Sequence, residues 1–184
     1  TALINPIVGD ENVINKFISS LPFQITTAQK HVIEEISEDQ KSSSRMLRLL
    51  QGDVGSGKTI VALISLLRAV TSGKQAALLA PTELLSKQHF QNISQLLKCL
   101  NIQPALLIGS MSQKQKKEVH EGLKSGKILL VIGTHALLTQ EIEFINLGLA
   151  VVDEQHRFGV KQRLVLGEKN GGCDVLIMTA TPIP

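Results

Sequence analysis

An eight-residue segment that contains three glycines, a lysine and a threonine has the composition of a phosphate-binding loop. It runs from Gly52 to Thr59 and fits the pattern G-x-x-x-x-G-K-[ST]. Glycines adopt positive φ and lack a Cβ, so consecutive backbone N–H groups can point inward at phosphate oxygens. We expect Lys58 to contact the β- and γ-phosphates of a nucleotide and the Thr59 hydroxyl to be a ligand of Mg²⁺. The predicted nucleotide contacts in this loop are Gly52, Asp53, Val54, Gly55, Ser56, Gly57, Lys58 and Thr59.

The segments on either side of this loop have the character that such chemistry needs. Residues 46–51 form a short apolar run typical of a buried strand, and residues 60–69 are apolar over a length typical of a helix. The N-terminus of that helix would add unpaired N–H groups and the positive end of its dipole to the anion site. An ordinary glycine-rich turn between a strand and a helix is the alternative, and these flanks disfavour it.

Two adjacent carboxylates form the second candidate element. Asp153 and Glu154 end the apolar run that begins at Leu149. In phosphoryl transfer to water, Asp153 could hold Mg²⁺ through bound waters while Glu154 orients and deprotonates the attacking water. A pair of solvated acids at the start of a helix is the alternative. Beside a phosphate loop, the pair favours a nucleotide hydrolase over a kinase. A hydrolase needs an acid that activates water, whereas a kinase needs a site for the acceptor of the phosphoryl group.

Alternating strands and helices would position these groups. Continuous apolar runs separated by helical segments predict an α/β fold: a mostly parallel sheet of about six strands with helices on both faces. In such a sheet, ligands bind outside the carboxyl ends of the strands. The predicted strands are residues 46–51, 75–80, 105–108, 128–132, 149–153 and 175–178, and the predicted helices after the loop are residues 60–73, 82–100, 112–123 and 154–168.

The N-terminal part predicts two helices. Asp10 can cap a helix that ends before Pro22, and we expect residues 1–22 to connect this domain to a preceding one. Thr26 and Gln29 have the spacing of a capping box at the start of the next helix. From the residues alone, Gln29 could be this helix-capping device or a ligand-binding side chain, and one residue could do both.

Length, charge and cysteine content bound the remaining possibilities. A chain of 184 residues suits one domain, and the net charge of +3 permits nucleic acid as a partner without requiring it. Two distant cysteines without a CxxC or Cys/His grouping favour a reducing compartment over a disulfide framework or a zinc site. The apolar runs are too short to span a membrane, and no signal peptide opens the chain. Because Thr1 replaces an initiator Met, we expect the chain to be a piece of a longer protein.

Together the motifs resemble the first motor domain of a superfamily-two helicase. Within that group, the sequences of the motifs are most similar to those of the RecG family of bacterial ATP-dependent DNA helicases. The transcription-repair coupling factors are the nearest alternative, but they usually have Glu in place of Gln155 and often Phe in place of Ser56. The segments that carry the resemblance are Phe23 with Gln29, the phosphate loop, and residues 80–85, 133–135, 153–159 and 179–184.

This resemblance implies a fold, a function and partners. It implies a RecA-like P-loop NTPase domain over residues 23–184 that couples hydrolysis of ATP with Mg²⁺ to remodelling of branched DNA in recombination and repair. Partners would be DNA, a second RecA-like motor domain that carries the arginine finger, and an N-terminal DNA-binding domain, all in the bacterial cytoplasm at the nucleoid and not at a membrane. Without the second motor domain, the piece should hydrolyse ATP very slowly.

The resemblance also implies roles for individual residues. Gln29 would read the adenine edge with Phe23 packed nearby, and Lys58, Asp153 and Glu154 would be catalytic. Four residues would couple the nucleotide state to movement: Gln155, His156, Thr179 and Thr181. Six would lie along the backbone of one DNA strand: Pro81, Thr82, Glu83, Gly133, Thr134 and His135.

Composition favours backbone contact if the partner is a nucleic acid. The chain has no Trp, no Tyr and five Phe, so it offers little surface for stacking bases. The lysines between residues 114 and 127 could bind phosphates or form a solvated helix face, and both interpretations stay open. The residues do not distinguish DNA from RNA. A nucleotide-binding regulatory module that does not hydrolyse is a further alternative, which Glu154 beside Asp153 disfavours.

Overall fold

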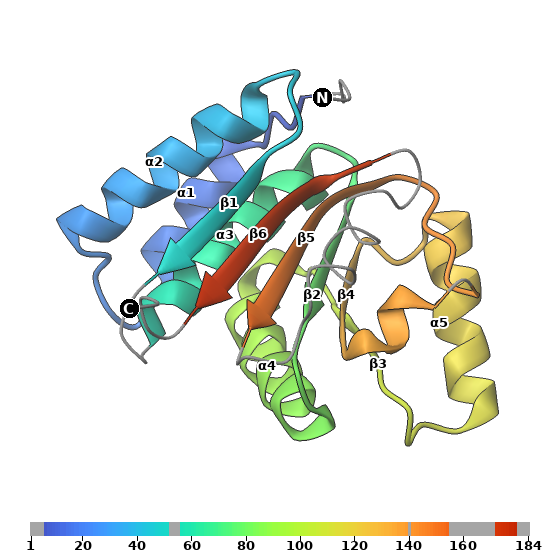
Figure 1. The fold of residues 1–184 in the computed structure, drawn as a ribbon. Helices are drawn as coiled ribbons and strands as arrows, with labels where there is room; N and C mark the ends of the chain where they lie inside the picture. The colour runs from blue at the N-terminus through green and yellow to red at the C-terminus, as the bar shows by residue number, and fades with distance from the viewer. Residues whose placement is uncertain (1–5, 52–55, 140, 155–171, 180–184) are drawn as a thin grey trace.

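A six-stranded parallel sheet forms the centre of the computed structural model, which describes residues 6–51, 56–139, 141–154 and 172–179 (Figure 1). The strand order is β1-β6-β5-β2-β4-β3, and every neighbouring pair is parallel. The predicted α/β fold with about six strands is therefore confirmed. The strands are β1 (Leu47–Gln51), β2 (Gln75–Leu79), β3 (Ala105–Leu107), β4 (Leu130–Gly133), β5 (Leu147–Glu154) and β6 (Asp174–Thr179).

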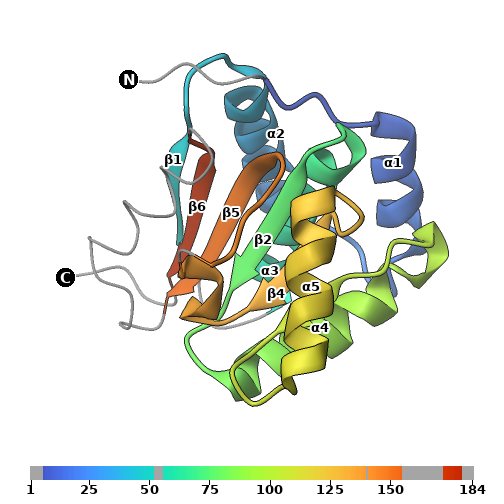
Figure 2. The same ribbon diagram turned by 90° about the vertical axis from the view of Figure 1, so that its right-hand side faces the viewer.

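Helices cover both faces of the sheet. Helices α1 to α4 contribute to the core on one face, whereas α5 and the short helix η2 contribute to the core on the other (Figures 1 and 2). The sequence patterns predicted the long helices, but not η2, because one turn is too short for helical periodicity. Their bounds are α1 (Glu11–Ser20), α2 (Thr27–Lys41), α3 (Ser56–Thr71), α4 (Glu83–Leu96), η1 (Lys98–Leu100), α5 (Gln113–Ser125) and η2 (His135–Leu138). The helix predicted for residues 154–168 lies almost entirely outside the described residues.

Helix α3 lies at the centre of the larger core, because its middle part, residues 60–67, is apolar on nearly all sides. Leu63, Ile64, Leu66 and Leu67 are fully buried, as expected of a helix without a polar face. Burying each such side chain contributes about 1.5–3 kcal/mol to folding. The helix that follows the phosphate loop is therefore fixed firmly against the sheet, which holds its N-terminus in place.

Helix α1 is part of the same packing. Asp10 caps it as predicted, with Oδ1 accepting from the backbone N–H of Asn12 at 3.0 Å. Ile14 and Phe17 are buried in the larger core, and the Arg68 guanidinium of α3 lies 3.3 Å from Glu11. A connection from residues 1–22 to a preceding domain stays a prediction.

Candidate nucleotide-binding site

Strand register aligns the two candidate motifs at one edge of the sheet. Thr179 at the end of β6 pairs with Gln51 of β1 on one side and with Glu154 of β5 on the other. Gln51 directly precedes the phosphate loop, and Glu154 belongs to the acidic pair. Because all three strands are parallel, their carboxyl ends meet at this edge (Figure 1). Segments that lie more than a hundred residues apart in the chain are thus neighbours in the fold.

Lys58 lies in the first turn of α3 and already contacts the end of β6. Its Nζ donates a hydrogen bond to the backbone oxygen of Thr179 at 2.9 Å. The side chain is half-buried, so the ammonium is presented at the strand ends rather than in open solvent. Thr179 Oγ1 is buried and has no hydrogen-bond partner among the described residues. Two groups able to bind oxygen atoms, an ammonium and a hydroxyl, therefore occupy this edge.

Gln29 and Gly57 meet beside Lys58. A Cβ on Gly57 would lie 2.5 Å from Nε2 of Gln29, so only glycine leaves the Gln29 amide its place. Both residues and Lys58 line a cavity of about 230 Å³, with Val32 and Val61 among its apolar walls. The cavity thus combines the amide of Gln29, the ammonium of Lys58 and apolar walls. This combination suits a nucleotide, which has a polar base edge, negative phosphates and an apolar ring face.

The predicted capping box at the start of α2 is present, and it orients Gln29. The Thr26 hydroxyl accepts from the Gln29 backbone N–H at 3.1 Å, and Gln29 Oε1 accepts from the Thr26 backbone N–H at 2.9 Å. Nε2 is not used in the box and faces Gly57. The helix-capping device and a ligand-reading amide are thus compatible in one side chain. The reading of adenine stays a prediction.

Phe23 does not share this cavity. It is 40% exposed and lines a separate hollow of about 540 Å³ together with Ile18, Leu21 and Lys30. Among the described residues, none lines both hollows. Its predicted packing beside adenine is therefore not visible as a common pocket and stays a prediction.

Asp153 makes a contact that the sequence motifs did not reveal. Its Oδ2 lies 2.9 Å from Nε2 of His89 on α4, and the two side chains are only 17% and 15% exposed. A carboxylate has no proton to donate, so the histidine is the donor. His89 stands 64 positions away in the chain, within a helical segment that gave no sign of chemistry.

Several predicted site residues lie outside the described part of the chain. Gly52, Asp53, Val54 and Gly55 of the phosphate loop are among them, as are Gln155, His156 and Thr181 of the coupling set. Ser56 begins α3 and Glu154 ends β5, but their side chains are not described. The roles predicted for all these residues stay predictions.

The described residues suit a magnesium ion that is held jointly with phosphates. They contain no group of three or more His, Cys, Asp or Glu that could bind a metal by itself. Mg²⁺ needs no such cage, because it keeps several waters and usually takes one or two protein ligands plus substrate phosphates. Thr59 in the first turn of α3 and Asp153 on β5 are the candidate ligands, and β6 lies between β5 and β1, the strand that precedes α3.

The predicted DNA-facing segment after β2 starts α4. The Thr82 hydroxyl caps this helix by accepting from the Leu85 backbone N–H at 3.2 Å. Glu83 Oε1 accepts from the backbone N–H of Ser110, at 3.1 Å, which ties the loop after β3 to the start of α4. The Ser110 hydrogen bond lowers the pKa of Glu83. The negative charge of Glu83 would repel a DNA phosphate. The hydrogen bond from Ser110 therefore supports a role for Glu83 as a bridge between the loop after β3 and the start of α4. Pro81 is half-buried beside these residues.

The predicted DNA-facing segment after β4 is mostly buried. A Cβ on Gly133 would lie 2.3 Å from the carbonyl oxygen of Leu107, so the neighbouring strand β3 requires glycine there. Thr134 is 5% exposed, and its hydroxyl caps η2 by accepting from the Ala136 backbone N–H at 3.3 Å. His135 is exposed. Of these three residues, His135 is the one whose side chain can reach a ligand outside.

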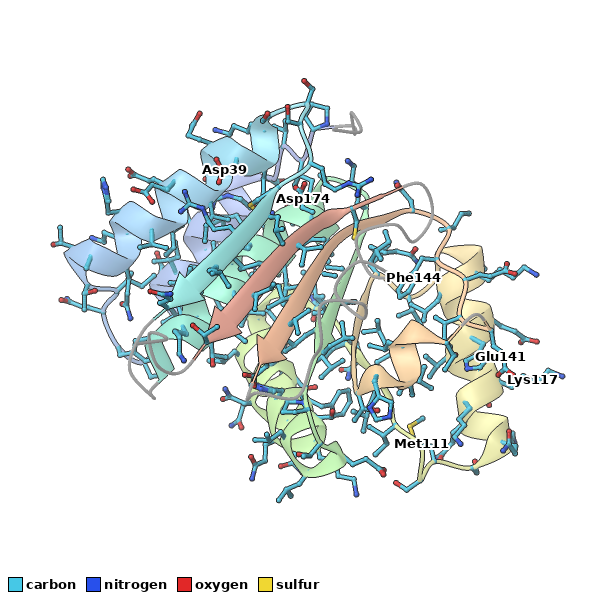
Figure 3. The ribbon with its side chains drawn as sticks, viewed as in Figure 1. Asp39, Met111, Lys117, Glu141, Phe144 and Asp174 are labelled. Atoms are coloured by element: carbon cyan, nitrogen blue, oxygen red, sulfur yellow. The ribbon has the colours of Figure 1, made fainter. Side chains whose placement is uncertain are left out.

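A cationic hollow lies next to this segment. Its volume is about 510 Å³, and it is lined by Lys116, Lys117 and His120 of α5 together with Thr139 and Glu141. Lys117 and Glu141 are labelled in Figure 3. The lysines are evident in the sequence without a defined role, because only the fold places them beside the loops at the carboxyl edge of the sheet.

Comparison with known proteins identifies close relatives of this domain. Residues 26–184 match the model of the DEAD/DEAH box helicase family. The ATP-dependent DNA helicase RecG of Aquifex aeolicus is 50% identical over 177 residues, which cover 95% of this chain and 22% of the relative. RecG of Streptococcus pneumoniae is 53% identical over 165 residues, which cover 90% of this chain and 24% of the relative. The predicted resemblance to RecG helicases is confirmed.

A solved structure extends this similarity to three dimensions. The structure of RecG bound to a three-way DNA junction matches with a TM-score of 0.87 and 42% sequence identity. The match covers 99% of this chain and 24% of that chain. The present chain therefore spans about a quarter of the length of the RecG proteins that it matches.

Proposed function

Because the chain belongs to the DEAD/DEAH box helicase family, we propose that it is the ATP-binding motor domain of a DNA helicase that remodels branched DNA. The similarity to RecG at 50–53% identity favours this function over a transcription-repair coupling translocase. RecG in the solved complex is bound to a three-way junction, which supports branched DNA as the substrate. The same proposal implies that the protein acts on the DNA of the bacterial nucleoid. Among the described helices, none is long and apolar enough to cross a membrane.

One observation carries the proposal: the row formed by Gln51, Thr179 and Glu154 across β1, β6 and β5. It brings the strand that precedes the predicted phosphate loop and the strand that ends in the predicted acidic pair to one edge, with β6 between them. Nucleotide hydrolysis by this class of site needs a phosphate cradle and a water-activating acid within reach of one substrate. A regulatory module that only binds nucleotide would not need the acid there.

In the proposed reaction, Lys58 exchanges its hydrogen bond with the Thr179 carbonyl for contacts with the β- and γ-phosphates. Gln29 donates Nε2–H to the adenine edge, and Glu154 takes a proton from the attacking water. Thr59 and Asp153 would hold Mg²⁺, and the ion would supply positive charge to the phosphates during the reaction. The described residues supply no arginine that contacts this cavity, so the arginine finger would come from the second motor domain.

DNA would lie across the loops after β2, β3 and β4. The groups there that could contact phosphates are the helix start at Thr82, the imidazole of His135 and the lysines of the cationic hollow. Such groups bind phosphates and carry little sequence information. This composition supports a motor that moves on DNA of any sequence.

The proposal is tested by steady-state ATP hydrolysis of the full-length protein with forked DNA, linear duplex and RNA. We expect forked DNA to stimulate hydrolysis most, and Lys58→Ala to abolish tight nucleotide binding and hydrolysis while the fold is kept. Wild-type rates in Lys58→Ala would refute the phosphate-loop assignment. Stimulation of ATP hydrolysis by RNA but not by DNA would refute the assignment of DNA as the substrate. Residues 1–184 alone should hydrolyse ATP roughly 10³ to 10⁵ times more slowly than the full protein, as removal of an arginine finger predicts.

A further inference from the structure

His89 holds one side of the carboxylate on which the proposed magnesium site depends. Its Nε2 lies 2.9 Å from Asp153 Oδ2, which is within ordinary hydrogen-bond range. Both side chains are largely buried, so water competes little for this bond. No other hydrogen bond to the Asp153 side chain is formed by the described residues. Among the described residues, Oδ1 of Asp153 is therefore the oxygen that remains available to a ligand.

The fold aims His89 at this position. Thr82 caps α4, and the Ser86 hydroxyl, which is fully buried, donates to the Thr82 carbonyl one turn before His89. The strand β2, which precedes α4, pairs directly with β5. The start of α4 is therefore anchored beside the carboxyl end of β5, and the histidine follows within the next turn.

We propose that His89 is a positioning residue for the Mg²⁺ site: it fixes the Asp153 carboxylate so that Oδ1 is presented to a water of Mg²⁺. This proposal rests on the proposed function. Carboxylates that serve metals are commonly oriented by a hydrogen-bond donor behind them, and removal of such a donor typically costs about 10- to 100-fold in metal affinity or activity. A purely structural role is the alternative, in which the bond only joins α4 to β5.

Two substitutions of similar size separate these roles. His89→Gln keeps an N–H donor at about the position of Nε2, whereas His89→Met fills a similar volume without a donor. His31→Ala is the matched control, because His31 also contacts a carboxylate, Glu35, at 3.1 Å, but on the exposed face of α2. Thermal unfolding of each full-length variant checks that the fold is kept.

The measurement is binding of a fluorescent, non-hydrolysable ATP analogue to the full-length protein as Mg²⁺ is titrated. We expect His89→Met to raise the Mg²⁺ concentration for half-maximal binding about 10- to 100-fold, while binding without Mg²⁺ is unchanged. His89→Gln should stay within about threefold of wild type, and His31→Ala should match it. Mn²⁺ binding in the presence of the analogue, followed by electron paramagnetic resonance, should show the same order of affinities.

Three results would overturn the proposal. An unchanged Mg²⁺ requirement in His89→Met would show that the donor is not needed. Equal loss of binding with and without Mg²⁺ would show a structural role. Equal defects in the Gln and Met variants would show that a hydrogen bond is not the cause. A wild-type protein whose nucleotide binding ignores Mg²⁺ would instead refute the proposed function, so the two failures are distinguishable.

Discussion

Asp174 should make the stability of this domain depend on pH in an unusual direction. It begins β6 and is fully buried, and its Oδ1 accepts from the Met46 backbone N–H at 2.8 Å, whereas Oδ2 has no hydrogen-bond partner among the described residues (Figure 3). Burial raises the pKa of Asp174 to about 6, although the Met46 N–H and the charge of Lys74 act in the opposite direction. The substitution Asp174→Asn keeps an oxygen acceptor for Met46 and removes the charge.

The magnitude follows from the shift in the pKa. Against an ordinary aspartate pKa of about 3.9, a rise of about two pH units corresponds to about 3 kcal/mol in the free energy of unfolding. The sign follows from proton binding: the folded state holds the proton more tightly than the unfolded state. The contribution of Asp174 to stability is therefore fully present below about pH 4 and is lost as the pH rises through about 6. Asp174→Asn has no carboxyl group at this position, so its free energy of unfolding does not fall for this reason as the pH rises.

The assay is urea denaturation of wild type and Asp174→Asn between pH 4 and pH 7. The difference between the two free energies of unfolding isolates Asp174, because the other carboxylates cancel. We expect this difference to move by about 2–3 kcal/mol in favour of the variant as the pH rises. Glu118→Gln, an exposed carboxylate of α5, should give a flat difference. A flat difference for Asp174→Asn as well would refute the reasoning.

Three further predictions concern the site. Gly57→Ala should displace the Gln29 amide and weaken nucleotide binding at least tenfold in a fluorescence titration. The free energy of unfolding should change by no more than about 1 kcal/mol, because the loss of the Gln29 capping bond and the gain in helix propensity offset each other. Glu154→Gln should bind ATP with Mg²⁺ yet leave it unhydrolysed in a single-turnover assay, and equally poor Mg²⁺-dependent ATP binding by Asp153→Asn and Glu154→Gln would contradict the assigned roles. Joint replacement of Lys116 and Lys117 by Ala should weaken DNA binding for all sequences and reduce the slope of log affinity against log salt by about 1 per lost phosphate contact. Lys124→Ala, on the same helix but paired with Glu143 at 3.8 Å, is the control and should keep the wild-type slope.

Local chemistry explains what could be predicted from the sequence. The caps at Asp10 and Thr26 were predictable because a helix N-terminus needs acceptors within three residues. The strands were predictable because a parallel sheet that is covered on both faces leaves continuous apolar runs. The phosphate loop and the acidic pair follow from short motifs whose spacing the chemistry dictates. In each case the interacting residues are close in the chain.

Contacts between distant segments could not be predicted in this way. His89 reaches Asp153 across 64 positions, and no local pattern marks that histidine. Gly133 is part of a motif, and the sequence suggested a DNA contact, but the fold shows that its missing side chain makes room for the Leu107 carbonyl. The role of Glu83 as a bridge to Ser110 also depends on the β3 loop lying beside α4. These facts follow from strand order, which the sequence pattern leaves undetermined.

Thr179, the predicted coupling residue at the end of β6, is in direct contact with Lys58, the predicted ligand of the nucleotide phosphates. Lys58 contacts the backbone oxygen of this residue, so any amino acid at position 179 would keep that bond. The hydroxyl Oγ1, by contrast, depends on the side chain, and it is buried without a partner among the described residues. Buried hydroxyls without partners cost free energy, about 1–3 kcal/mol each. A ligand oxygen at this edge of the sheet would offset that cost by pairing with Oγ1, which is the physical basis on which the predicted coupling role of Thr179 can be tested.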